Sequence, residues 1–210
     1  MNDVLKTGTT TLGLVCKDVI VLAADKRATA GDMIVQKNAQ KIFKLADNLA
    51  VTVAGTVSDV QLLIKLVRAE LKLKEVRIGR RASAKEAANL MANYVYSNIR
   101  SFSVIPGITH FLMAGSDESG LHLFDIFPDG SVNEIQDYVS SGSGSVFVYG
   151  VLESSYKPAM DEKEAVDLAM KSINSSIQRD TGSGNGLDVW AIDKNGIRIV
   201  MEKLITQRVA

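Results

Sequence analysis

A threonine-rich run near the start of the chain, Thr7-Gly8-Thr9-Thr10-Thr11, suits one form of nucleophilic chemistry. A threonine hydroxyl is a weak nucleophile unless a base lies within hydrogen-bond distance, and the residue's own free α-amino group can be that base. The pKa of such an amine, about 7.7 to 8.0, lies near the pH at which a general base works best. The nitrogen of Thr9 is not basic while it belongs to the Gly8-Thr9 amide. Cleavage of that bond would therefore create the catalyst.

Taken alone, this run is better explained as a β-rich segment that enters a strand. The other nucleophiles are no better placed. Cys16 lies beside a tight turn at Lys17, and His110 and His122 fall in predicted strands without a nucleophile elbow nearby. The sequence therefore predicts no conventional catalytic triad.

The glycine- and serine-rich run Gly142-Ser143-Gly144-Ser145 could approach an anion through its backbone N–H groups. It has neither the spacing of a P-loop nor that of a dinucleotide-binding turn. A tight or flexible turn is therefore the better interpretation, and nucleotide binding is disfavoured.

Composition narrows the function classes further. The 210 residues are 46% hydrophobic and 23% charged, which fits one globular domain. Lys and Arg number 24, as do Asp and Glu, so no net charge attracts nucleic acid or an anionic membrane. One cysteine and two histidines are too few for the usual zinc shells, and we expect neither a metal nor a cofactor. No apolar run reaches the ~18 residues of a membrane span, and residues 1–6 lack the apolar core of a secretory signal, so we expect a cytoplasmic protein.

Apolar periodicity predicts alternating groups of strands and helices. Strands are expected at Thr11–Val15, Val19–Ala23, Ile42–Lys44, Leu49–Ala54, Thr109–Ala114, Leu121–Phe127, Leu187–Ile192 and Ile197–Met201. Helices are expected from Ser58 to about Val76, from a capping box formed by Ser83 and Glu86, and from a second box formed by Asp161 and Glu164. This order favours an α+β layered sandwich over the strict βαβ alternation of a Rossmann fold.

Six segments of the chain, all in register, resemble the proteasome β subunit over essentially all of residues 7–201. They are Thr-Gly-Thr-Thr-Thr-Leu-Gly (7–13), Ala-Ala-Asp-Lys-Arg-Ala-Thr (23–29), Lys-Asn-Ala-Gln-Lys-Ile-Phe (37–43), Val-Ala-Gly-Thr-Val-Ser-Asp (53–59), Gly-Ser-Gly-Ser-Val-Phe-Val-Tyr-Gly-Val-Leu-Glu (142–153) and Gln-Arg-Asp-Thr-Gly-Ser-Gly (178–184). The eight residues before Thr9 resemble the short leader of archaeal members. The resemblance implies the four-layer αββα sandwich of N-terminal nucleophile hydrolases. It also implies a propeptide at residues 1–8, removed by autocatalytic cleavage between Gly8 and Thr9, and one catalytic domain at 9–210.

The resemblance assigns roles to individual residues. Thr9 matches the nucleophile, Asp25 the supporting acid, Lys41 the buried lysine, and Gly55 the residue whose backbone N–H forms the oxyanion hole. Three further residues match those that surround the terminal amine: Ser143, Asp180 and Ser183. Without Thr9, an ordinary ion pair would explain Asp25 and Lys41. Gly55 also fits a strand-to-helix turn, which is compatible with its role in the oxyanion hole.

The implied function is a threonine endopeptidase that degrades unfolded polypeptides. The implied partners are other β subunits in a seven-membered ring, rings of α subunits outside it and, indirectly, a regulatory ATPase. By the same resemblance, the pocket for the residue preceding the cut is formed by Ala28, Thr29, Ala39, Phe43, Val53, Val57 and Gln61. None of these residues is acidic, which favours cleavage after hydrophobic residues over basic ones.

Three alternatives stay open. The chain could be a noncatalytic β subunit that keeps its leader and serves the ring architecture. A bacterial two-component relative in six-membered rings fits less well, because the Gln-Arg-Asp-Thr-Gly-Ser segment is usually missing there. The pocket could also discriminate little between substrates.

Overall fold

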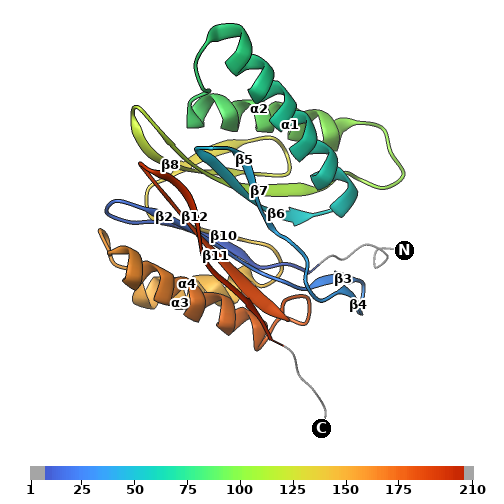
Figure 1. The fold of residues 1–210 in the computed structure, drawn as a ribbon. Helices are drawn as coiled ribbons and strands as arrows, with labels where there is room; N and C mark the ends of the chain where they lie inside the picture. The colour runs from blue at the N-terminus through green and yellow to red at the C-terminus, as the bar shows by residue number, and fades with distance from the viewer. Residues whose placement is uncertain (1–7, 206–210) are drawn as a thin grey trace.

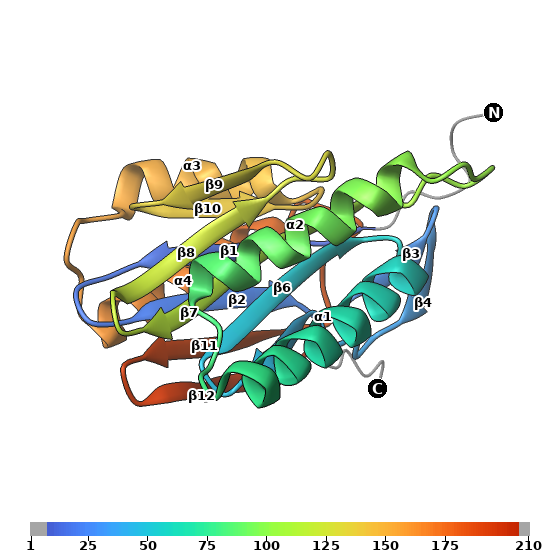
Figure 2. The same ribbon diagram turned by 90° about the horizontal axis from the view of Figure 1, so that it is seen from above.

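The computed structural model describes residues 8–205, which fold around two five-stranded antiparallel sheets. The first sheet has the order β10-β1-β2-β11-β12, formed by Tyr138–Ser141, Thr11–Val15, Ile20–Asp25, Gly186–Asp193 and Gly196–Leu204. The second has the order β5-β6-β7-β8-β9, formed by Ile42–Ala46, Leu49–Gly55, Thr109–Asp117, Gly120–Ile126 and Val132–Ile135. A small hairpin of β3 (Ala28–Ala30) and β4 (Met33–Gln36) lies beside the start of α1 (Figure 2).

Helices cover the outer face of each sheet (Figure 1). The second sheet is covered by α1 (Val57–Ile78) and α2 (Ala84–Arg100). The first is covered by α3 (Ser145–Ser155) and α4 (Glu162–Ile177). The result is a four-layer αββα sandwich, which confirms the predicted fold class.

Strand residues alternate between two apolar layers. On β2, Leu22 packs between the sheets while Val21 faces α3 and α4. On β7, Leu112 packs between the sheets while Phe111 faces α1 and α2. All four of these side chains are fully buried. Burial on both faces explains why these strands read as continuous apolar runs in the sequence.

Both predicted capping boxes are confirmed. The backbone N–H of Glu86 donates to Ser83 Oγ (3.2 Å), and the Ser83 N–H donates to the Glu86 carboxylate (2.9 Å). Asp161 and Glu164 make the same reciprocal pair at the start of α4. These contacts satisfy N–H groups that have no partner inside the helix, which is why local sequence sufficed to place both helix starts.

The prediction of three helices was wrong, because a fourth, α3, follows the glycine- and serine-rich run directly. Its first turns contain Val146, Phe147 and Val148, and β-branched and aromatic residues have low helix propensity. Tertiary packing decides the conformation, because Val148 and Leu152 are fully buried against the first sheet. The short strands β3, β4, β9 and β10 were also missing from the prediction.

Replacing the first cap, Ser83→Ala, should lower the free energy of unfolding by about 1 kcal/mol, because the Glu86 N–H loses its acceptor. Ser97→Ala is the matched control: it lies on the exposed side of the same helix, where its hydroxyl bonds only a carbonyl of the preceding turn. The control should stay within about 0.5 kcal/mol of the parent. Urea unfolding of the isolated chain measures both, and equal losses would contradict the capping role.

Candidate active site

Strand register brings the predicted site residues to one end of the two sheets. In the pairing of β1 with β2, Thr11 lies opposite Ala24, so Asp25 lies beside Thr10. In the pairing of β1 with β10, Thr11 lies opposite Ser141, so the loop at 142–144 lies beside Thr9. Because β1 is paired on both sides, the chain just before it is enclosed by segments from distant parts of the sequence.

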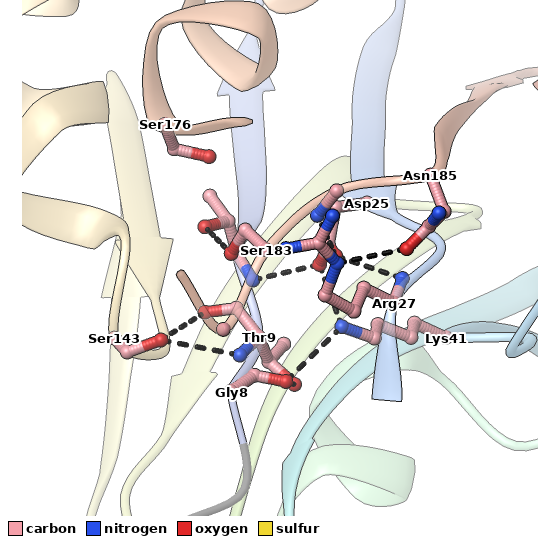
Figure 3. Close-up of polar contacts among 12 residues, drawn as sticks. Gly8, Thr9, Asp25, Arg27, Lys41, Ser143, Ser176, Ser183 and Asn185 are labelled. Atoms are coloured by element: carbon pink, nitrogen blue, oxygen red, sulfur yellow. Dashed lines mark hydrogen bonds and ion pairs between the residues drawn. The ribbon is translucent and has the colours of Figure 1, made fainter. Parts of the chain in front are cut away.

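Thr9 has polar partners at both its hydroxyl and its nitrogen (Figure 3). Its Oγ lies 2.7 Å from the Gly8 carbonyl oxygen, to which it donates. Its backbone N–H donates to Ser143 Oγ (3.2 Å), and Ser143 Oγ in turn donates to the carboxylate of Asp180 (2.7 Å). Ser143 therefore contacts the nitrogen that would become a terminal amine, and Asp180 is connected to that nitrogen through Ser143.

Ser183 was expected beside the Thr9 nitrogen, but its hydroxyl contacts Thr10 instead. Its hydroxyl contacts the hydroxyl of Thr10 (2.6 Å) and donates to Asp180 (2.6 Å), so it meets the Thr9 nitrogen through Asp180 and Ser143. Asp180 thus joins two serines from different loops. Ser183 holds Thr10 and Asp180 in place instead of touching Thr9.

Lys41 and Asp25 form a buried ion pair beside Thr9. Lys41 Nζ lies 2.6 Å from Asp25 Oδ1 and 3.3 Å from the Gly8 carbonyl oxygen, and both side chains are almost fully buried. Burial lowers the pKa of the Lys41 ammonium, while the negative charge of Asp25 acts in the opposite direction. A polarising group therefore stands at the carbonyl oxygen next to the Thr9 hydroxyl.

Asp25 is held by backbone donors from three segments. Its carboxylate accepts from the N–H groups of Thr10 (2.9 Å), Arg27 (2.9 Å) and Gly184 (2.9 Å). Three backbone donors and the Lys41 ammonium compensate the cost of burying this charge and fix its orientation.

Two residues of this network, Thr10 and Arg27, were not assigned from the sequence. Arg27 Nε donates to Asn185 (2.8 Å), and its guanidinium also donates to the Thr181 carbonyl (2.8 Å). Arg27 therefore fixes the position of the loop that follows Asp180. Both residues lie inside the segments that resemble the family, next to assigned positions. Their contacts depend on the loop at 181–185, which local sequence does not place.

Glycines allow the close approach of these loops. Gly142 has φ +93°, and a Cβ there would overlap the Thr9 carbonyl oxygen. Gly8 and Gly182 pack backbone against backbone, so a side chain at either position would overlap the other residue. Gly55 has φ +120°, and a Cβ there would overlap the Ile108 carbonyl oxygen. Only glycine fits these three contacts without a backbone shift.

A cavity of about 260 Å³ opens on one side of Thr9. It contains all seven residues predicted for the substrate pocket: Ala28, Thr29, Ala39, Phe43, Val53, Val57 and Gln61. Gly8 also lines it, and its N–H donates to Thr29 Oγ (2.8 Å). The cavity therefore lies on the side of the residue that precedes the Gly8-Thr9 bond.

A second hollow of about 360 Å³ lies on the other side of Thr9, and the sequence did not predict it. It shares Thr9, Ala54 and Gly55 with the first cavity. Its other walls are Thr56, Pro106, Ile108, His110, Pro128, Ser141 and Gly142. Thr9 and Gly55 thus line both the first cavity and the second hollow.

Among residues 8–205, no group of three His, Cys, Asp or Glu side chains is arranged to hold a metal ion. No helix in that part of the chain is long and apolar enough to cross a membrane. The expected leader falls at residues 1–8, of which the structure describes Gly8.

Comparison with known proteins identifies the family of the chain. The family model described as "Proteasome subunit" matches residues 5–192. The chain is 41% identical over 204 residues to a protein named proteasome subunit beta from Methanocaldococcus fervens, covering 97% of this chain and 89% of the relative. Proteins of the same name from Archaeoglobus fulgidus and Ferroglobus placidus are 41% and 40% identical, over 93% and 97% of this chain and 90% and 96% of their own lengths. The resemblance found in the sequence is thereby confirmed, and the chain belongs to the proteasome subunit family.

Proposed function

We propose that the chain is a threonine endopeptidase subunit of the proteasome core, activated by its own cleavage between Gly8 and Thr9. The observation that carries the proposal is the placement of Thr9: its hydroxyl and the Lys41 ammonium both lie at the Gly8 carbonyl oxygen. Its nitrogen, meanwhile, lies at Ser143, which bonds Asp180. A nucleophile, a cation for the developing oxyanion and a polar site for an amine are thus assembled at one residue.

Activation begins with attack of Thr9 Oγ on the Gly8 carbonyl carbon. The new C–O bond replaces the Gly8–Thr9 C–N bond, and the proton lost by the hydroxyl passes to the Thr9 nitrogen. Water then hydrolyses the resulting ester, which frees the Thr9 hydroxyl and leaves a carboxylate on Gly8. Lys41 suits this step, because its ammonium group lies 3.3 Å from the Gly8 oxygen, where negative charge develops.

Peptide hydrolysis repeats the attack on a second chain. Thr9 Oγ attacks the scissile carbonyl, its proton passes through the free Thr9 amine to the leaving nitrogen, and water releases the acyl group. The Gly55 backbone N–H is assigned to the oxyanion, and Lys41, oriented by Asp25, stabilises the threonine oxygen. Ser143 and Asp180 orient the amine.

Membership of the family supports assembly into core rings with α subunits, and the proposal extends it to the substrate and the regulatory ATPase. We place the chain in the cytoplasm, in a seven-membered β ring between rings of α subunits, where unfolded polypeptide delivered by a regulatory ATPase reaches an enclosed chamber. The alternative, a noncatalytic β subunit of the same ring, would keep its leader. The two roles differ in whether the assembled chain keeps or loses its leader.

Replacing the nucleophile, Thr9→Ala, should leave the leader attached, because no hydroxyl remains to attack Gly8. The parent chain, assembled with α subunits, should begin at Thr9. Mass measurement of the intact chain reads both results, with Ser97→Ala as the control for loss of an exposed hydroxyl outside the site. A parent that keeps its leader favours the noncatalytic role. Normal processing of a pure Thr9→Ala ring shows that Thr9 is not the autolytic nucleophile.

Removing the lysine charge, Lys41→Ala, should lower peptide turnover by at least about 100-fold, because the charge beside the threonine oxygen is lost. Asp25→Asn should cost less, provided that the lysine stays charged without it. Turnover is measured on particles assembled from chains produced with Thr9 as their first residue, so that no variant has to cleave its own leader, with Lys163→Ala on exposed surface as the control. Turnover of assembled Lys41→Ala particles equal to that of the parent would refute the assigned role.

The first cavity should select hydrophobic residues before the cut. Burying an apolar side chain gains roughly 1.5 to 3 kcal/mol, whereas an unpaired charge loses its hydration. Fluorogenic peptides ending in Tyr or Leu should therefore be cleaved faster than those ending in Arg or Glu. Equal or faster cleavage after Arg would mean that this cavity does not select the preceding residue.

A further inference from the structure

Three polar side chains from three strands form a hydrogen-bonded group next to the second hollow. His110 on β7 bonds through Nε2 to Asp125 on β8 (2.6 Å) and through Nδ1 to Ser141 at the end of β10 (2.7 Å). Asp125 and Ser141 are buried, at 4% and 3% exposed. The His110 ring also stacks on Phe127, with centroids 5.0 Å apart. The ring is therefore held on several sides in one orientation.

His110 separates the Asp125 carboxylate from the hollow. His110 and Ser141 line the hollow, whereas Asp125 does not. Because Asp125 and Ser141 occupy both ring nitrogens, the imidazole presents carbon atoms to the hollow. Together with Pro106, Ile108 and Pro128, it gives the hollow mainly apolar walls.

The first cavity and the second hollow lie on opposite sides of the scissile bond. Gly8, which precedes the bond at Thr9, lines the first cavity and not the second. A substrate with its scissile carbonyl at Thr9 and the preceding side chain in the first cavity continues past Thr9 toward the second hollow. The residue after the cut therefore reaches the space beside His110.

We propose that this second hollow receives the side chain that follows the cut, and that His110 is its specificity-determining residue. Apolar side chains are favoured there, because the imidazole ring separates the buried carboxylate of Asp125 from the hollow and Pro106, Ile108 and Pro128 form apolar walls. The inference rests on the proposed peptidase function, since it concerns the leaving side of the same substrate.

Removing the imidazole should change which residue the second hollow accepts after the cut. In His110→Ala, the Asp125 carboxylate faces an enlarged hollow and attracts a substrate cation. Lysine after the cut should then gain about tenfold relative to leucine. In His110→Ala/Asp125→Asn the space stays but the charge is gone, so the gain for lysine should disappear.

The experiment uses processed particles assembled with α subunits and pairs of unlabelled peptides that compete in one reaction. Each pair has leucine before the cut and differs only in leucine or lysine after it, and mass spectrometry measures the product ratio. This ratio does not depend on how much active enzyme is present. His122→Ala is the control, because the other histidine bonds Ser119 and Glu134 and lines neither hollow.

A lysine-to-leucine ratio in His110→Ala within about twofold of the parent overturns the inference, as does a gain that persists in the double variant. If His110→Ala does not assemble, the double variant decides alone, because its uncharged, larger hollow should favour phenylalanine over alanine after the cut. An unchanged phenylalanine-to-alanine ratio would then overturn the proposal. Failure of the parent particle to cleave any peptide would instead refute the proposed function itself.

Discussion

The buried ion pair between Asp25 and Lys41 joins the two sheets at the site. Asp25 ends β2 of the first sheet and Lys41 immediately precedes β5 of the second, so the pair spans the interface between them. Breaking such a pair by removing one partner leaves an uncompensated buried charge, which is strongly unfavourable. The position of Lys41 relative to Thr9 therefore depends on how the two sheets pack.

The first sheet positions Thr9 and the two loops that surround its nitrogen. Thr9 enters β1, which is hydrogen-bonded to β2 on one side and to β10 on the other. The loop that follows β10 brings Ser143 to the Thr9 nitrogen, and the loop that follows α4 brings Asp180 to Ser143. Glycines at 142 and 182 allow the close backbone approach of these loops. A side chain at either glycine would push these loops apart. The geometry of the site therefore depends on the absence of side chains at these positions as well as on polar contacts.

Thr9 also lines two cavities, one beside α1 and one beside the ends of β7 and β10. A cleavage site needs this arrangement, because substrate must extend in both directions from the attacked carbonyl. Small side chains line the first cavity, whereas the His110 group lies beside the second hollow. The specificity that we propose would thus be built from strand ends and short loops on a rigid scaffold.

Sequence alone determined the helix starts at Ser83 and Asp161 and the strands of the core, because capping and apolar periodicity are local. It also identified the site residues, but by resemblance to a family and not by their spacing. Only the tertiary structure decided that the segment at 145–155 is a helix, that Arg27 ties down the loop beside Asp25, and that His110 joins Asp125 and Ser141. These outcomes depend on strand register and burial between residues far apart in the chain, which no local pattern encodes.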